Sequence, residues 1–371
     1  MLHVLREYAG SRLDAAGETE GASLAHALHY RDLLQRIGPE LRTSRHVEVV
    51  EQLEADHANF VRAIEWALET DDSALAVDLY GKLMHLWWDR AQREGWLLAQ
   101  RVLAARPARP TRARALALGA AAHVAIAYDL DEALSLGGQA LEIFENLDDR
   151  PRIANTKVFL ANVYQTIGRP GGREMLEQGL ESLRAAGDDY GAAIALSNLS
   201  DFALQDGDFP AAARLAEEAA ATAHAQGFAD LEATSTFNQA VALVHQDNPR
   251  GAETARSALR LATRGKMQLW VGMSLFAVAA AIAGAEPRRA ALLLGASEAV
   301  LQGMHLPPAE TAVRDRATTM SRDALGAASF EQLLEEGGML SRDAAVELGL
   351  GVGEGPKAEP SLALGAPTQV P

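Results

Sequence analysis

The sequence predicts an all-α fold, a right-handed α-solenoid of helical hairpins with extra helices at its N- and C-terminal ends. Four prolines recur 40, 39 and 38 residues apart, each before an alanine-rich stretch: Pro170, Pro210, Pro249 and Pro287. Four glycines alternate with them at spacings of 40, 38 and 38 residues: Gly187, Gly227, Gly265 and Gly303. Alanine makes up about one residue in five. A constant period of this length indicates stacked helical repeats.

Each repeat reads as a helix, a short turn, a second helix and a longer turn. Proline suits the first turn of a helix, because the N–H that it lacks would have no partner there. Glycine suits the end of a helix, because it readily adopts the left-handed conformation that terminates many helices. The pattern predicts five repeats within residues 111–305 and a weaker one at about 72–106.

Small residues recur where the two helices of a repeat would cross. They are Ala121, Ala133 and Ala140, then Ala161, Gly172 and Gly179, then Ser200, Ala212 and Ala219. A larger side chain would push the helix axes apart, so we interpret these positions as contact seams.

Additional helices are predicted before the repeats. Residues 1–43 contain two, at 2–14 and 22–37. Residues 44–110 begin with one long amphipathic helix at 44–70, followed by the weak first repeat.

The segment after the repeats, residues 306–350, contains closing helices. They are predicted at 310–326 and 329–348, with a helix start at Ser341. The tail 351–371 is rich in Gly and Pro and has no hydrophobic period, so we expect it to be disordered.

Charge and composition exclude several classes of protein. With 50 acidic and 34 basic residues the net charge is −16, so the surface would repel nucleic-acid phosphates. Cysteine is absent, which excludes disulfides and thiolate sites. No apolar run approaches the roughly 20 residues of a membrane span. We expect a cytoplasmic protein that binds neither membranes nor, directly, nucleic acid.

The usual catalytic motifs are missing. There is no Gly-x-x-x-x-Gly-Lys-Ser/Thr loop, and Gly265-Lys266 lies in a turn between predicted helices with no strand before it. Ser297 lies in the middle of a predicted helix, where it cannot be the nucleophile of a hydrolase elbow. We therefore expect no enzymatic activity and no cofactor.

Four histidines are candidate metal ligands: His26, His29, His46 and His57. A zinc site would need a denser ligand pattern such as His-Glu-x-x-His, which the sequence lacks. We interpret these histidines as surface or packing residues and predict no metal site.

One stretch has an unusual local charge. No acidic residue occurs between Glu94 and Asp129, and five arginines do: Arg101, Arg106, Arg109, Arg112 and Arg114. The stretch either binds a phosphate or an acidic segment through bidentate contacts, or is a solvated linker. The sequence favours the linker.

Four of the five tryptophans lie within about 30 residues: Trp66, Trp87, Trp88 and Trp96. They form either the wall of a small-molecule effector pocket or the core that joins the N-terminal helices to the first repeat. The core is the favoured interpretation.

Polar residues are predicted along the inner face of the repeats. In such arrays the first helix of each hairpin lines a concave groove. This places eight residues there: Asn155, Asn162, Gln165, Asn198, Asp201, Gln205, Gln239 and His245. A row of amides suits hydrogen bonding to the backbone of a bound peptide or helix. The other interpretation is a hydrated face without a dedicated ligand.

The repeats resemble tetratricopeptide repeats, most clearly from Gln205 to Ala219 (QDGDFPAAARLAEEA). Four further segments resemble, in the same order, bacterial signal-transduction ATPases of the STAND class. LHVLREYA at 2–9 with Gly17-Glu18, within the helices of residues 1–43, resembles the end of the winged-helix segment of that class. LEADHANFVRAIEW at 53–66 resembles the helix that opens its repeat region. RAALLLGASEA at 289–299, and LGAASF at 325–330 with Glu336-Gly337, resemble the closing motifs of that region. The resemblance covers about 2–349.

This resemblance implies a transcriptional regulator of the LuxR-like or antibiotic-pathway type, in which the repeats sense a signal or partner and control a nucleotide switch. The nucleotide-binding core and the DNA-binding part of that family are not in this sequence. We therefore expect either a piece of a longer regulator or a stand-alone remnant of one.

The leading hypothesis is a non-catalytic sensor and protein-interaction module that binds a protein or peptide in its concave groove. The nucleotide-binding part of the same regulator is one candidate partner. The alternative is a receptor for a small-molecule effector near the tryptophans. The partner, the pathway and the oligomeric state cannot be read from the sequence.

Overall fold

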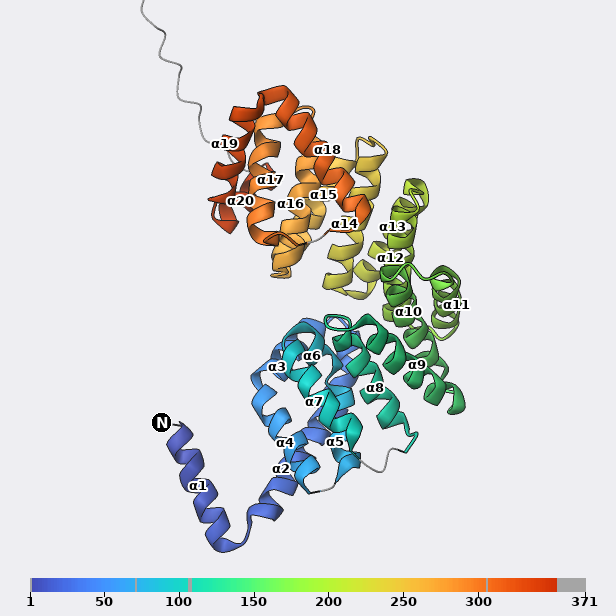
Figure 1. Cartoon of the computed structure of the whole chain (residues 1–371), viewed down its shortest axis with the longest axis vertical. Coiled ribbons are helices and arrows are strands. Elements are labelled where there is room, and N and C mark those ends of the chain that lie inside the picture. The colour runs from blue at the N-terminus through green and yellow to red at the C-terminus, as the bar shows by residue number, and fades with distance from the viewer. Residues whose placement is uncertain (1, 71, 106–108, 305, 352–371) are drawn as a thin grey trace, which may run out of the picture. The chain divides into compact units, whose positions relative to one another are not determined.

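The computed structural model describes residues 2–70, 72–105, 109–304 and 306–351. Within this part every regular element is helical, which confirms the predicted all-α class (Figure 1). The chain divides into two compact units. Unit 1 comprises the residues up to Asp206 together with 214–235, and unit 2 comprises 207–213 and the residues from Thr236 onward. Helices α13 (Phe209–Gln226) and α14 (Ala229–His245) contribute residues to both units.

Unit 1 begins with the predicted N-terminal helices. They are α1 (Leu2–Ala16), α2 (Thr19–Ile37), the 3₁₀ helix η1 (Gly38–Arg42), α3 (His46–Ala55), α4 (His57–Glu69), α5 (Ser73–Lys82), α6 (Met84–Asp89) and α7 (Gln92–Ala104).

The prediction of one helix over 44–70 was wrong, because the backbone leaves the helical conformation at Asp56. The Asp56 carboxylate accepts hydrogen bonds from Tyr30 Oη and Asn59 Nδ2, both at 3.0 Å. Such side-chain bonds compete with regular helix. The apolar stripe nevertheless continues across the break, since Leu53, Phe60 and Ile64 are fully buried.

The helical hairpins of unit 1 follow. They are formed by α8 (Arg112–Ala125), α9 (Leu130–Asn146), α10 (Arg150–Thr166), α11 (Gly172–Ala185) and α12 (Asp189–Gln205). Each helix packs on the next, as expected for consecutive hairpins. Aspartates cap α9, α10 and α12, where the side chains of Asp129, Asp149 and Asp188 accept backbone N–H groups of the first turn.

The predicted places of proline and glycine are confirmed only in part, because Pro170 and Pro249 each lie two residues before the first residue of the helix that follows. Pro210 and Pro287 lie in the first turns of their helices, and Gly187, Gly227 and Gly303 have φ of +66°, +75° and +76°. Gly265 was predicted wrongly as a left-handed cap, since its φ is −75°. The next residue, Lys266, takes the left-handed position with φ of +54°.

Unit 2 contains the remaining helices. They are α15 (Gly251–Arg264), α16 (Gln268–Ile282), α17 (Pro287–Leu301), α18 (Pro308–Leu325), α19 (Ala327–Gly338) and α20 (Arg342–Leu350). The helix start predicted at Ser341 is confirmed, because its side chain caps α20 by accepting the N–H of Ala344 at 3.2 Å. Residues 329–348 therefore belong to two helices rather than to one. The predicted disordered tail lies outside the described residues, apart from Gly351.

The contact seams are confirmed by burial, since all nine predicted small residues are buried. The tightest crossing joins α17 to α19 in unit 2. A Cβ added to Gly295 would lie 1.9 Å from the Leu334 carbonyl oxygen, and one added to Gly337 would lie 2.1 Å from that of Leu292. Gly295 lies within the segment 289–299, and Gly337 follows the segment 325–330. Backbone contact between the two helices therefore explains why these positions carry glycine.

This crossing yields a stability prediction with a control at the neighbouring residue. Gly337→Ala should destabilise unit 2 by about 3 kcal/mol, because the helices must separate to admit the methyl group. Gly338→Ala should be neutral or slightly stabilising, since its Cβ would lie 3.7 Å from the nearest atom, the Gly295 oxygen. Urea unfolding measures both variants, and hydrogen exchange of α17 and α19 gives a local readout. Equal effects of the two substitutions would contradict this account of the crossing.

Candidate functional site

The predicted groove residues fall into the two units. Asn155, Asn162 and Gln165 lie on α10, and Asn198, Asp201 and Gln205 lie on α12, all in unit 1. Gln239 and His245 lie on α14 in unit 2. Unit 1 therefore brings together six of the eight on two helices that contact each other.

Two of these amides have unused hydrogen-bond donors. Gln165 Nε2 and Asn198 Nδ2 are buried, and neither has an acceptor among the described residues. They belong to neighbouring first helices. Asn162 is half-buried and Gln205 is exposed, so the row also has accessible members.

The unit 2 members do not form an exposed polar row, and this part of the prediction needs correction. Gln239 is only 7% exposed. His245 stacks on Phe209 with ring centroids 4.0 Å apart, and its Nε2 lies 3.0 Å from the Ala309 carbonyl oxygen. Burial lowers the pKa of His245. The His245 side chain therefore contacts residues of unit 2 rather than lining an exposed polar face.

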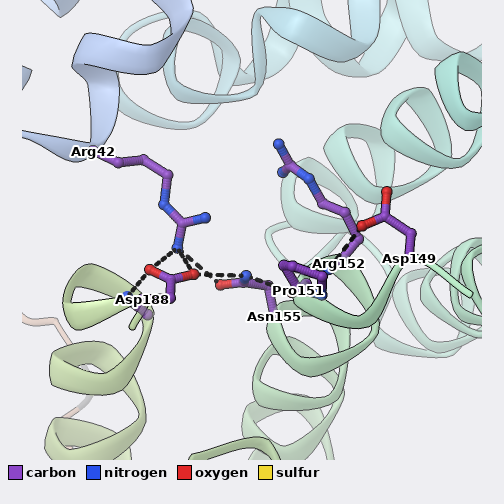
Figure 2. A network of polar contacts seen from close by, with 7 residues as sticks. Arg42, Asp149, Pro151, Arg152, Asn155 and Asp188 are labelled. Carbon is purple, nitrogen blue, oxygen red and sulfur yellow. Dashed lines mark hydrogen bonds and ion pairs between the residues drawn. The ribbon is translucent and has the colours of Figure 1, made fainter. Parts of the chain in front are cut away.

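Asn155 contacts the chain's own N-terminal part rather than open solvent (Figure 2). Arg42 Nη2, at the end of η1, lies 2.9 and 2.8 Å from the two carboxylate oxygens of Asp188 and 3.3 Å from Asn155 Oδ1. Asp188 also accepts the backbone N–H of Gly191 at 3.0 Å, so one carboxylate caps α12 and holds Arg42.

Further contacts attach the segment from Arg42 to His46 to the repeats. The Arg42 guanidinium lies 5.3 Å from the centre of the Tyr190 ring. His46 stacks on the same ring at 6.3 Å, and a Cβ on Gly227 would lie 2.8 Å from Ser44 Cβ. This contact could not be predicted from the sequence. A short 3₁₀ segment shows no hydrophobic periodicity, and its partners Asn155 and Asp188 lie more than 100 residues later in the chain.

Basic side chains gather beside this contact. We call Arg42, His46, His85, His123 and Arg152 the cationic cluster; they come from η1, α3, α6, α8 and α10. The rings of His46 and His85 are 5.0 Å apart, and His123 packs on Phe159 at 4.2 Å. The sequence does not indicate this cluster, because its members form no short motif: no two of them lie within three residues of each other.

The electrostatics of the cluster follow from burial and like charge. Burial, then the positive charges of Arg112 and Arg42, lower the pKa of Arg152, while Asp149 and Asp188 oppose this. Burial, then His46, His123, Arg42 and Arg152, lower the pKa of His85 to about 3. Burial also lowers the pKa of His123. The site is therefore unfavourable for additional positive charge.

The tryptophans lie at different depths. Trp87 is fully buried and donates its indole N–H to the Tyr80 carbonyl at 3.0 Å. Trp66 and Trp96 are half-buried against the same core, and Trp88 is 39% exposed. Trp87 has a packing role in this arrangement. Effector binding at these residues stays a prediction.

The arginine-rich stretch is partly paired within unit 1. Arg112 contacts Asp149 at 2.7 Å, Arg101 contacts Glu65 at 3.0 Å, and Arg114 donates to the Leu103 carbonyl at 3.1 Å. Arg106 lies outside the described residues.

The part of the chain that is described contains no group of three or more His, Asp or Glu suited to hold a metal ion. His57 contacts Glu94 at 2.9 Å, and His26 and His29 pack around Tyr30. None of the described helices is long and apolar enough to span a membrane. An open depression in unit 2 is lined by glutamates, Glu298, Glu331 and Glu335 among them.

No protein-family model and no curated protein matches this sequence. Among solved structures, the chain is similar to a Signal Transduction ATPase with Numerous Domains (STAND) protein with a tetratricopeptide repeat sensor from Pyrococcus horikoshii. The TM-score is 0.51 at 15% identity, over 83% of this chain and 46% of that one. It is also similar to BtubC (BKLC) from P. vanneervenii, with a TM-score of 0.40 at 18% identity over 63% of this chain and 91% of that one. The chain thus spans less than half of the ATPase, and the likeness establishes a tetratricopeptide-like helical repeat fold.

The Arg42 contact predicts a local change in stability. Arg42→Met should cost about 1–2 kcal/mol, because it leaves the largely buried Asp188 carboxylate without its cation. Hydrogen exchange of residues 38–46 should accelerate, since the segment loses its anchor on α10 and α12. Arg101→Met, which removes an exposed ion pair, should change neither the stability nor this exchange appreciably. Unchanged exchange at 38–46 in Arg42→Met would show that the ion pair does not anchor the segment.

The low pKa of His85 predicts a pH dependence of stability. An unfolded histidine titrates near 6.5, so between that pH and about 3 the unfolded chain binds more protons than the folded one. Stability conferred by neutral His85 is complete above pH 6.5 and falls as the pH drops, by at most about 1.4 kcal/mol per pH unit. His85→Gln should flatten this part of the curve, and the wild type is the reference for the slope. Urea unfolding from pH 7 to pH 4 measures both slopes, and an unaltered slope in His85→Gln would refute the assignment.

Proposed function

We propose that this chain is the non-catalytic sensor and protein-interaction module of a STAND-type regulator. It binds a protein or peptide along the first helices of its hairpins, and the nucleotide-binding part of the same regulator is one candidate partner. The tetratricopeptide-like fold and the structural likeness to a STAND protein with such a sensor support this proposal. The resemblance of four sequence segments to that class points the same way.

One observation carries the binding mode: Gln165 and Asn198 each keep a buried amide donor without an acceptor among the described residues. An unsatisfied buried donor costs about 1–3 kcal/mol, so such groups usually have a partner in the functional state. Carbonyl oxygens of an extended or helical peptide are suitable acceptors, and they occur at regular intervals along any backbone. The two donors lie on adjacent first helices, α10 and α12, which is where a bound segment would cross the repeats.

The net charge of −16 supports a protein partner over nucleic acid. The missing phosphate-binding loop and nucleophile elbow support a role without catalysis. Contact with DNA and nucleotide hydrolysis are assigned, in this proposal, to other parts of a regulator.

The binding mode is tested with a peptide selected from a random library on the immobilised chain. Replacing both donors, Gln165→Ala with Asn198→Ala, should weaken its Kd about tenfold or more, because two buried hydrogen bonds are lost. Fluorescence anisotropy of the labelled peptide measures this change.

The matched control is the double variant Gln139→Ala with Gln178→Ala, which removes two exposed amides from second helices α9 and α11. It should bind the peptide as the wild type does. A selected peptide that binds equally well to the donor-deleted and control variants would show that the first helices do not form the binding surface.

A further inference from the structure

We propose that the cationic cluster of unit 1 is a binding site for a small oxyanion, a carboxylate or a phosphate group, held by Arg152 with Arg42 and His85. This inference goes beyond the proposed partner surface. It assigns an effector site to residues that the sequence motifs did not single out.

The side chains converge from separate elements. Arg152 lies one turn before Asn155 on α10, so both project from one face of that helix. Asn155 accepts a hydrogen bond from Arg42, and Arg42 and Arg152 are close enough for the charge of Arg42 to lower the pKa of Arg152. Figure 2 shows Arg152 rising from α10 beside the contact between Arg42 and Asp188. The His85 ring lies 5.0 Å from that of His46, four residues after Arg42, and the charges of Arg42 and Arg152 both lower its pKa.

Arg152 lacks a counterion of its own. The nearby carboxylates are committed, since Asp188 pairs with Arg42 at 2.8 Å and Asp149 pairs with Arg112 at 2.7 Å. No side chain in the described part of the protein accepts a hydrogen bond from the Arg152 guanidinium. A largely buried cation that shares its nearby carboxylates with other arginines is only partly compensated, and a bound anion lowers the remaining cost.

His85 gives the site a second, adjustable charge. It faces His46 from α3, His123 from α8, Arg42 from η1 and Arg152 from α10, and all four disfavour its protonation. An anion between Arg152 and His85 would reverse this balance, because a nearby negative charge favours the protonated ring. Binding should therefore be accompanied by proton uptake, more strongly for a dianion than for a monoanion.

The ligand class follows from the donors. A guanidinium presents its N–H groups in a planar fork that matches two oxygens of a carboxylate or phosphate. The cluster lies among five elements of one compact unit, so it suits a small anion or the terminal group of a small molecule. Two probes distinguish a phosphate ligand from a carboxylate ligand. They are inorganic phosphate and malonate, each compared with chloride at equal ionic strength.

The first test is thermal unfolding with and without these anions, for wild type, Arg152→Gln and Arg150→Gln. Arg150 is the matched control, because it lies on the same helix but is 81% exposed. Phosphate or malonate should raise the Tm of wild type and Arg150→Gln. Arg152→Gln should have a higher Tm than wild type without added anion, since a buried charge has been removed, and should show no anion-dependent shift.

The second test is titration calorimetry with the same anions in two buffers of different ionisation enthalpy. Wild type should take up protons on binding, and His85→Gln should bind without that uptake. Arg152→Lys keeps the charge but loses the planar fork, so its affinity should fall about tenfold, which keeps the test decisive if Arg152→Gln does not fold.

The proposal is overturned if neither anion shifts the wild-type Tm beyond the chloride control, or if Arg152→Gln keeps the full shift. The partner surface is tested separately, because Arg152→Gln should still bind the selected peptide and the Gln165 and Asn198 double variant should still bind the anion. Failure of one proposal can therefore be told from failure of the other.

Discussion

Helices in this chain approach one another so closely that only glycine, alanine or serine fits at their crossings. The alanines of the predicted seams are completely buried, and at the α17–α19 crossing a Cβ on Gly295 or Gly337 would collide with backbone. Tight crossings hold α10 and α12 side by side, which places Asn155 near Asp188 at the start of α12. The candidate site therefore depends on small residues that make no polar contact themselves.

The contact between η1 and the repeats adds a tertiary element to this periodic frame. Arg42 contacts a carboxylate 146 residues later in the chain, and that carboxylate also caps a helix. One side chain thereby couples the N-terminal helices to two hairpins of unit 1. Because Asp188 pairs with Arg42 and Asp149 pairs with Arg112, Arg152 has no ion pair of its own among the described residues.

A protein with a net charge of −16 that gathers two arginines and three histidines in one partly buried place maintains an unfavourable local charge. Residues held at a cost to stability are commonly found at binding sites, since the cost is relieved by the ligand. The unsatisfied amides of Gln165 and Asn198 follow the same logic with hydrogen bonds in place of charge. The two proposals therefore assign to unit 1 two sites of different chemistry, which meet on α10.

The repeat period, the helical class and the buried seams could be predicted from the sequence, because proline, glycine and alanine act through local backbone geometry and close packing. The helix start at Ser341 could also be predicted, but the break at Asp56 was missed, since an apolar stripe can continue across a short interruption of the backbone. All six predicted groove residues of unit 1 lie on the expected helices, but only the folded chain decides that Asn155 contacts Arg42 and that Gln239 is buried. The cationic cluster depends entirely on tertiary structure, because its charges come from five elements spread over more than 100 residues. A local sequence pattern does not determine which of these elements contact one another in the folded chain.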